Sequence, residues 1–440
     1  MKKILFIFFL FAFIMNNLHA QVELQKNRII DISTKENILL NDTSFSHVLE
    51  MPFLSFDIEF ISNPGLYSFL TKNNQNIILD LQVYKNNTRN IGYHCIDLQN
   101  HLLYYAFKNN QVVYSFGIDH RLFAEVSLSK ELISLVIDGN YQYINQTIYL
   151  DDHNYSRAFN YFSIFFGYSR MLEDRYLLNA KFKLIKGVGS IGIANRKSSI
   201  LFSDNFGTHQ NPFSSDISID GSYFINNDYK PFSNLGFAID LYFDYDHNNN
   251  FTVYTKTNDL GFIVWKENTW NKEANHVSQD FFPFDGIEYI LAQDTTANSL
   301  LSAELTNLTD SVSNIFNQID SAGVLNQFRL LPFTIHFGAN YILNNENSQF
   351  SIDYSIKKLY NSFLHTGKIS YLYSLDRYNF SIIPSYSFNK FNYANVSILL
   401  HKKWKNKFYS NIYVNNIIDA LSIKSGGKNL GFGWQLYLIF

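Results

Sequence analysis

Apolar and polar residues alternate along much of the chain with a period of two, which is the period of a β-strand. The clearest example is the last stretch, where one parity is wholly apolar: Leu430, Phe432, Trp434, Leu436, Leu438 and Phe440. The same alternation recurs over residues 112–121, 235–245, 333–341 and 350–357. The pattern predicts an all-β protein built from many antiparallel strands.

The first twenty residues have the layout of a secretory signal peptide. Lys2 and Lys3 precede an apolar run from Ile4 to Met15, and Leu18-His19-Ala20 offers a small-residue cleavage site. A run of this length is too short to span a bilayer as a helix, and no run of about 18 apolar residues follows. We therefore expect an exported protein whose residues 1–20 are removed.

Two architectures fit an exported chain with alternating strands. In a soluble sandwich the apolar face of each strand points inward, whereas in a transmembrane barrel it faces lipid and the polar face lines the lumen. Periodicity alone does not separate them. The large outward residues, the strand lengths of roughly 10 residues and the export signal favour an antiparallel transmembrane β-barrel in the outer membrane of a Gram-negative cell.

Fourteen segments alternate in this way: 100–108, 111–127, 157–172, 174–186, 189–203, 232–246, 251–266, 328–344, 348–358, 364–375, 377–388, 391–404, 406–416 and 429–440. Residues 51–62 also alternate and could raise the number to 16. An even number is expected because both ends of a bacterial barrel lie in the periplasm. We predict about 14 strands, within a range of about 12 to 16.

Two stretches break the alternation and predict helices. Residues 129–139 begin with a capping Ser129 and end at Gly139, which predicts a short helix. Residues 298–320 carry a narrow apolar stripe at helical spacing, inside a loop insertion at about 283–322. The strand count places this insertion on the extracellular side, as a cap over the barrel mouth. The predicted layout is signal peptide 1–20, a segment 21–99 that forms either a plug or the first strands, and barrel 100–440.

Composition narrows the functions that the chain can have. Aromatic residues make up 17% of the chain and charged residues 17%, and the formal net charge is −3. Near-neutral charge argues against nucleic acid as a partner. The single cysteine, Cys95, excludes a disulfide framework and a cysteine-rich metal site. Rings in this number suit strands that face lipid and its interfaces, so outer-membrane lipids are the expected surroundings.

Six charged or titratable residues fall on the polar parity of the predicted strands: Asp119, Arg121, Asp240, His336, Asp353 and Lys357. A basic residue that faces lipid at mid-depth costs about 2–4 kcal/mol, so we expect these side chains to line the lumen. There they either pair with one another or contact a small solute.

The last strand predicts a second partner. A terminal aromatic that closes an alternating strand resembles the assembly signal of bacterial outer-membrane barrels, and it is carried here by Trp434, Leu436, Leu438 and Phe440. The barrel-assembly machinery is therefore an expected partner.

The search for catalytic and metal-binding motifs yields little. No nucleophile elbow, zinc motif, phosphate loop or dinucleotide fingerprint is present in the sequence. Asp244, Asp246 and Asn248 have the spacing of a calcium loop, but Asn249 replaces its glycine and Thr255 its final glutamate, so a hydrophilic turn is favoured. We expect no enzyme activity, no metal and no cofactor.

A series of short motifs carries a family resemblance. In chain order they are 114–121 (YSFGIDHR), 139–140 (GN), 181–187 (KFKLIKG), 236–241 (GFAIDL), 259–266 (DLGFIVWK), 284–286 (FDG) and 331–333 (LPF). Their order over about residues 50–440 resembles an uncharacterised family of Bacteroidota outer-membrane proteins, similar in shape to long-chain fatty-acid transport (FadL-like) barrels. The resemblance implies an outer-membrane barrel and supplies no substrate or active site.

Two functions remain open at this point. The first is a passive channel or transporter for small solutes, hydrophobic ones among them, which the barrel pattern and the expected cap favour. The second is a structural or scaffold barrel that accompanies a cell-envelope or secretion complex, which the lack of a recognisable ligand motif favours.

Overall fold

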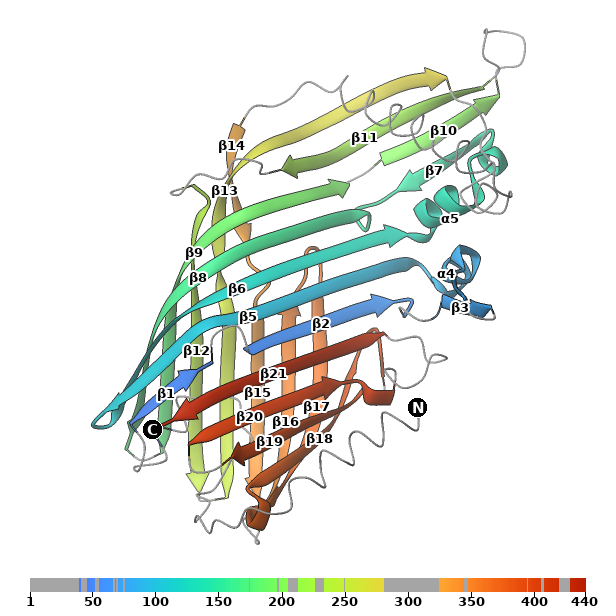
Figure 1. The fold of residues 1–440 in the computed structure, drawn as a ribbon. Coiled ribbons are helices and arrows are strands. Elements are labelled where there is room, and N and C mark those ends of the chain that lie inside the picture. The colour runs from blue at the N-terminus through green and yellow to red at the C-terminus, as the bar shows by residue number, and fades with distance from the viewer. Residues whose placement is uncertain are drawn as a thin grey trace.

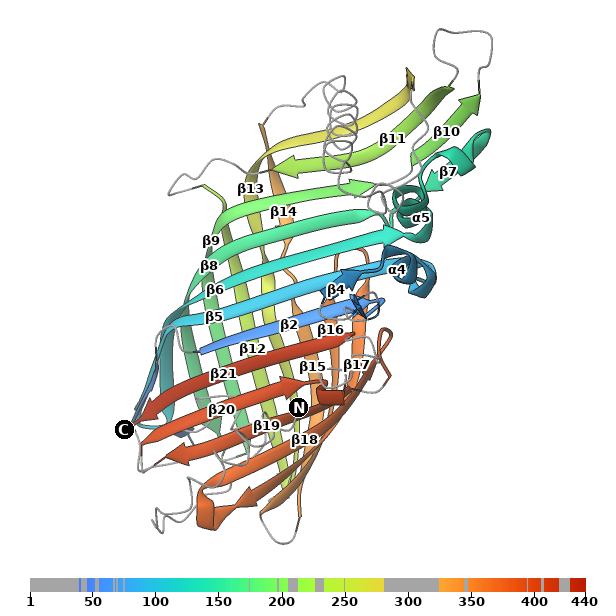
Figure 2. The ribbon, with the colours of Figure 1, turned by 45° about the vertical axis from the view of Figure 1, so that its right-hand side comes forward.

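The wall of the molecule is a closed antiparallel barrel of fourteen strands, as predicted (Figures 1 and 2). It closes because the last strand of the chain pairs with the first. The computed structural model describes residues 39–40, 46–51, 55–65, 68, 70–73, 76–173, 175–195, 198–204, 213–225, 233–248, 250–280, 324–343, 347–393, 395–404, 407–418 and 428–440.

Two of the fourteen wall strands are each made of two segments. The first consists of β1 (His47–Glu50) and β2 (Ser55–Asn63), which both pair with the second and the last strand. The eighth consists of β14 (Val324–Leu330) and β15 (Thr334–Ile342), which both pair with the strand before them. Pro332 lies between these two segments, where its missing N–H cannot donate to the ladder.

The other twelve strands follow in chain order around the barrel. They are β5 (Ile91–Asn109), β6 (Val112–Ser129), β8 (Tyr155–Leu172), β9 (Tyr176–Asn195), β12 (Leu235–Asn248), β13 (Phe251–Asp280), β16 (Ser348–Lys358), β17 (Phe363–Leu375), β18 (Phe380–Asn389), β19 (Asn395–Trp404), β20 (Phe408–Asn415) and β21 (Asn429–Ile439). In Figure 1, β2, β5, β6, β8 and β9 cross the near wall obliquely, and β15, β16 and β17 are seen behind them.

The fourteen predicted segments reach the right number through two errors that cancel. Of residues 51–62, the stretch 55–62 does belong to the wall, within β2. Segments 174–186 and 189–203 are mostly one strand, β9, followed by the short β10 (Ser198–Asp204). Gly187 and Gly189 suggest a turn, but the chain runs straight on with a bulge opposite Asn160 and Tyr161. A side chain at Gly187 would collide with the Trp265 ring, which explains the glycine.

The two ends of the barrel differ in the length of their connections. At one end, which we call the turn end, connections of two to five residues join β5 to β6, β8 to β9, β12 to β13, β15 to β16, β17 to β18 and β19 to β20. Three of these connections hold a residue with positive φ, at Asn110, Glu173 and Asn379. The opposite loop end carries longer links, among them residues 64–90, 130–154, 196–234 and 281–323. Short turns at one end and long loops at the other are typical of outer-membrane barrels.

The segment with calcium-loop spacing lies at the turn end and forms a hydrophilic turn, as favoured from the sequence. Asn248 ends β12, and its side-chain oxygen accepts hydrogen bonds from the backbone N–H of Asn250 (2.9 Å) and Phe251 (2.8 Å). An Asn that folds over the next residues in this way stabilises a tight turn.

The other described elements lie mostly at the loop end, where some of them extend the sheet of the wall (Figure 2). They are β3 (Leu70–Asn73), β4 (Asn76–Leu79), α4 (Leu81–Asn87), α5 (Lys130–Asp138), η1 (Tyr141–Tyr143), β7 (Gln146–Leu150), β10 and β11 (Phe213–Ile225), while η2 (Asp376–Tyr378) lies at the turn end. The predicted helix at 129–139 is confirmed as α5: Ser129 caps it by accepting from the Leu132 N–H, and it ends at Gly139 (φ 83°). The described helices include none that is long and apolar enough to cross a membrane.

The predicted helix at 298–320 and the insertion at 283–322 lie outside the described residues. Their placement as a cap therefore stays a prediction.

The strands turn large apolar side chains outward. In β8, Phe162, Ile164 and Phe166 are 37–61% exposed, whereas Tyr161 and Phe165, on the other parity, are 2–3% exposed. The same holds around the barrel for many strands, with outward residues such as Leu184, Phe237, Phe337, Ile352, Phe388 and Trp434. The outer surface of the barrel is thus a broad apolar belt of aromatic and aliphatic side chains.

A pH-dependent contact joins α4 and α5 at the loop end. Asp138 accepts hydrogen bonds from Lys85 (2.5 Å) and Gln82 (3.0 Å). Burial alone would raise the pKa of Asp138, but these hydrogen bonds outweigh it and hold the pKa below its ordinary value. The contact is therefore complete above the ordinary Asp pKa of about 3.9 and is lost as pH falls through the lowered pKa.

We expect the amides of α4 to lose hydrogen-exchange protection below about pH 4. Their free energy of opening should fall by no more than about 1 kcal/mol, because the pair of Lys85 with Asp138 is partly exposed. Asp138→Asn should show the low protection at neutral pH already, and Asp152→Asn, at an exposed position, should behave like the wild type. Equal protection of α4 at pH 3 and pH 7 in the wild type would contradict this role of Asp138.

Candidate functional site: a closed polar chamber

The interior of the barrel holds a polar chamber made of two adjoining cavities. The first has a volume of about 330 Å³ and is lined from β2, β5, β6, β8, β9, β12, β13 and β21. The second has a volume of about 500 Å³ and extends around the wall from β2 to β21 through β13 and β15–β20. Asp57, Arg121 and Asp259 belong to the lining of both cavities. Volumes of this size suit a small molecule.

A buried arginine stands where the two cavities meet. Arg121, on β6, donates a bidentate pair of hydrogen bonds to Asp97 on β5, from Nε (2.8 Å) and Nη2 (2.6 Å). Its Nη1 donates to Asp259 on β13 (2.6 Å) and to the carbonyl of Pro332 (3.1 Å), between β14 and β15. The side chain thus joins three parts of the wall.

Asp259 reaches this arginine because the backbone of β13 is irregular there. Asp259 has a positive φ of 56°, and its N–H donates to the Asp240 carboxylate (2.7 Å) instead of the neighbouring strand. The pairing of β12 with β13 shifts at this point. Lys183, on β9, then lies between the two carboxylates, 2.7 Å from each. A bulge of this kind re-aims side chains, and here it directs two acids into the lumen.

A second lysine completes the network on the other side of the chamber. Lys357, on β16, donates to Glu59 on β2 (2.7 Å) and lies 3.0 Å from Asp97. Asp97, Asp240 and Asp259 therefore share three cations, Arg121, Lys183 and Lys357. Charges buried this deeply are tolerated only when they are paired and hydrogen-bonded, which these are.

The structure places all six residues expected in the lumen on the lining of the chamber: Asp119, Arg121 and Asp240 in the first cavity, and Arg121, His336, Asp353 and Lys357 in the second. Asp119 pairs with His101 (2.9 Å), and His336 pairs with Asp353 (3.1 Å). Arg121, Asp240 and Lys357 come together in the network described above. Whether any of the six contacts a solute stays a prediction.

Four members of the network are absent from that set: Glu59, Asp97, Lys183 and Asp259. A signal existed for Glu59 and Lys183, because both lie on the polar parity of alternating segments. Asp97 lies in the first half of β5, where the alternation is weak, and Asp259 owes its inward position to the bulge. No pattern in the sequence predicts that bulge.

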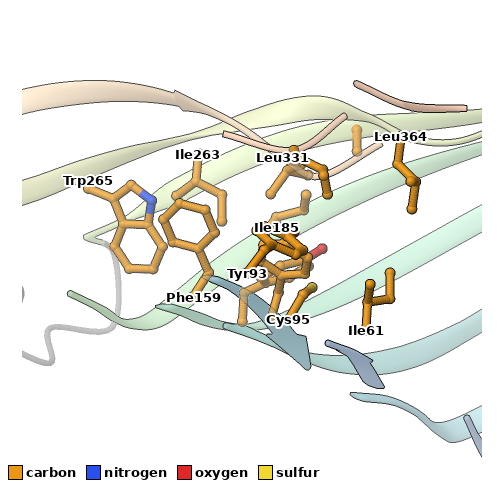
Figure 3. Packing of buried hydrophobic residues seen from close by; sticks show 13 residues of the cluster. Ile61, Tyr93, Cys95, Phe159, Ile185, Ile263, Trp265, Leu331 and Leu364 are labelled. Carbon is orange, nitrogen blue, oxygen red and sulfur yellow. The ribbon is translucent and has the colours of Figure 1, made fainter. Parts of the chain in front are cut away.

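Apolar side chains fill the lumen between the chamber and the loop end (Figure 3). The cluster brings together inward residues from many walls: Ile61, Tyr93, Cys95, Phe123, Phe159, Tyr161, Ile185, Ala238, Ile263, Trp265, Leu331, Leu359 and Leu364. The Phe159 ring stacks on Trp265 with centroids 6.1 Å apart, and Tyr93 stacks on Phe391 at 5.0 Å. Cys95 is one of the packed residues. The cluster closes this side of the chamber.

The connection between β16 and β17 folds inward and is anchored to the opposite wall. The backbone N–H of Tyr360 donates to the Glu125 carboxylate on β6 (3.0 Å). Glu125 also accepts from the Tyr93 hydroxyl (3.0 Å) and from Arg157. The Arg157 guanidinium lies over the Tyr360 ring, and that ring packs on Tyr155 at 4.9 Å. Glu125 therefore holds a short loop across the lumen.

A second apolar closure lies toward the turn end. Leu39, from the segment before the first strand, is fully buried in a cluster with inward residues of β1, β5, β6, β8, β20 and β21. Leu40 packs against this cluster and against Leu177 and Tyr242 on the wall of β9 and β12. The Lys108 ammonium donates to the Leu40 carbonyl (3.3 Å). Residues 39–40 thus lie inside the barrel, and residues 47–50 and 55–63 form part of its wall.

The last strand has the orientation that its alternation indicates. Trp434 and Phe440 are 38% and 44% exposed on the outer surface, and Leu436 and Leu438 share their parity. Tyr437 and Ile439 on the other parity are fully buried. The backbone carbonyl of Phe440 accepts hydrogen bonds from the N–H groups of Ser46 and His47, which ties the end of the chain to the first strand.

One family model matches the chain over most of its length, from residue 41 to residue 410, and its description is "Family of unknown function (DUF5723)". The chain belongs to this family. DUF5723 membership agrees with the resemblance to an uncharacterised family found in the sequence. The comparison with curated proteins found no match.

Among solved structures, this DUF5723 barrel is similar to several channels at low identity. The Pseudomonas putida toluene transporter TodX is 8% identical, with 94% of this chain and 93% of TodX covered and a TM-score of 0.41. A Pseudomonas aeruginosa FadL homologue is 9% identical, with 90% of each chain covered and a TM-score of 0.41. The CymD monoaromatic hydrocarbon channel is 7% identical, with 97% and 96% covered and a TM-score of 0.43. Likenesses this distant do not bear on the substrate of this chain.

Proposed function

We propose that the protein is an outer-membrane barrel that passes small solutes through a gated lumen. The observation that carries the proposal is the contrast between the two sides of the wall. Outside lies an apolar belt that suits lipid, and inside lies a polar chamber that two apolar clusters close. A chamber with a closure on each side is the arrangement that a gated passage requires.

The lining of the chamber favours a polar solute over a hydrophobic one. The second cavity is walled by hydroxyl and amide groups in addition to its charges, for example Ser351, Ser355, Thr366, Ser370, Asn389 and Asn395. An apolar solute would leave the hydroxyls that bond no other described group, such as those of Ser355 and Thr366, without a hydrogen-bond partner, at a cost of about 1–3 kcal/mol for each group.

The proposed location and assembly follow from the same features. The segment 1–20 would direct export and be cleaved, and the short connections of the turn end would face the periplasm. The outward Trp434, Leu436, Leu438 and Phe440 would present the last strand to the barrel-assembly machinery.

Swelling of proteoliposomes tests the passage. We expect the purified protein to admit arabinose, a small uncharged sugar, and to exclude the tetrasaccharide stachyose, because the cavities hold a few hundred cubic ångströms. Empty liposomes and liposomes with heat-unfolded protein are the controls. Vesicles that swell in neither sugar, also when the loop at 359–362 is released by mutation, would overturn the proposal.

A scaffold barrel is the alternative, and one observation favours it. The cluster around Trp265 and Leu359 consists of buried side chains from many strands, as a permanent core does. In that case no solute would cross, and mild extraction from native membranes should recover a partner protein in constant ratio.

A further inference from the structure

The second cavity of the chamber contains two charged side chains that differ from all the others on its lining. Asp57, on β2, and Lys368, on β17, make no ion pair and no hydrogen bond with the described residues. The other charged residues of this cavity are engaged: Glu59 and Asp97 bind Lys357, Asp259 binds Arg121, Asp353 binds His336, and Lys256 also takes part in an interaction.

The surroundings of Asp57 favour the binding of a cation. Glu59 and Asp97 are its acidic neighbours, and the two cationic neighbours are engaged elsewhere: His101 pairs with Asp119, and Lys357 is shared between Glu59 and Asp97. An unpaired carboxylate inside a barrel loses hydration without regaining it, so an added ammonium group would be stabilised.

The surroundings of Lys368 favour the binding of an anion. Its nearest acid is Asp353, whose carboxylate is taken by His336 (3.1 Å) and by the Tyr254 hydroxyl (2.8 Å). Although it lies inside the barrel, the Lys368 side chain is exposed, and it lines the second cavity. Its ammonium is thus free to meet an anion in the cavity.

The two groups project into one cavity from different walls. Between β2 and β17 the sheet contains β21, β20, β19 and β18, so several strand spacings separate the two backbones. A ligand that satisfies both must carry an ammonium at one end and a carboxylate at the other, at a distance. Ser370 and Ser385 also line the cavity, and their hydroxyls, which bond each other (2.9 Å), can bond a polar middle part as well.

We propose that the chamber binds a short zwitterionic peptide, with its amino terminus at Asp57 and its carboxyl terminus at Lys368. This inference rests on the proposed passage and names the class of solute. A free amino acid has both charges on one carbon and would satisfy only one of the two groups at a time.

Calorimetric titration of the full-length barrel in detergent tests the assignment with three probes: alanylalanine, its N-acetyl derivative and its amide. We expect alanylalanine to bind at least about tenfold more tightly than either blocked form. Asp57→Asn should lower the affinity for alanylalanine and for its amide about tenfold and leave the affinity for the N-acetyl form unchanged. Lys368→Met should lower the affinity for alanylalanine and for its N-acetyl form and leave the affinity for the amide unchanged.

Two exposed positions supply matched controls, Asp151→Asn and Lys407→Met, and both should bind all three probes as the wild type does. Because Asp57 and Lys368 hold no other described group, each variant should migrate as a folded barrel in an unheated gel. Equal binding of the three probes, or no binding of any, would overturn the peptide assignment. If the peptides fail to bind but vesicles still swell in arabinose, the proposed passage is supported and only the peptide assignment is wrong. If each variant weakens binding of the expected probes but no sugar enters the vesicles, the binding site is supported and the proposed passage is wrong.

Discussion

Arg121→Met is expected to destabilise the barrel by about 3–5 kcal/mol, because it leaves two buried carboxylates, Asp97 and Asp259, without their main partner. The arginine also donates to the Pro332 carbonyl, so the junction between β14 and β15 would lose this hydrogen bond to β6. Urea unfolding in lipid vesicles, followed by tryptophan fluorescence, measures the change.

Two further variants show whether unpaired charge is the cause. Arg377→Met, at an exposed position in the turn end, should leave the urea midpoint within about 0.5 kcal/mol of the wild type. Adding Asp97→Asn and Asp259→Asn to Arg121→Met should restore a large part of the loss, since Lys183 keeps Asp240 and Lys357 keeps Glu59. If the Arg121→Met barrel were as stable as the wild type, water would have to hydrate the Asp97 and Asp259 carboxylates in place of the arginine.

The fold could be predicted largely because a barrel wall repeats one simple rule. In each strand one parity is outside and the other inside, so the alternation in β8 or β21 assigns every side chain to a face. The rule is local and needs no knowledge of the partner strand. It failed at β9, where Gly187, which makes room for the Trp265 ring, and the nearby Gly189 together resemble a turn.

The chamber could be predicted only in part, because its pairs join residues far apart in the chain. The alternation places Arg121 and Lys357 inside, but nothing in it says that Arg121 meets Asp259 or that Lys357 meets Glu59. The apolar closure was missed for another reason. Phe159, Tyr161 and Phe165 lie on the inward parity of a strand whose outward parity is also aromatic. A strand that is apolar on both faces signals a packed lumen, and this signal was available in the sequence.

The charge at Glu125 controls the loop-end closure if the anchored loop is the gate. Glu125→Ala removes the acceptor of the Tyr360 N–H and of the Tyr93 hydroxyl, so the loop at 359–362 loses its attachment to β6. Hydrogen bonds to a charged group contribute about 1.5–3 kcal/mol each, which would raise the open population at least about tenfold. We expect the rate of arabinose uptake by proteoliposomes to rise by a similar factor.

A second variant separates opening of the gate from damage to the wall. Tyr360→Ala keeps the pair of Glu125 with Arg157 but removes the ring that packs on Tyr155, so it should raise uptake in the same direction and by less. Glu131→Ala, at an exposed position on α5, should leave uptake unchanged. If Glu125→Ala and Tyr360→Ala both fold and neither admits more arabinose, the loop is not the gate. The packed cluster around Trp265 would then be the barrier that a solute has to pass.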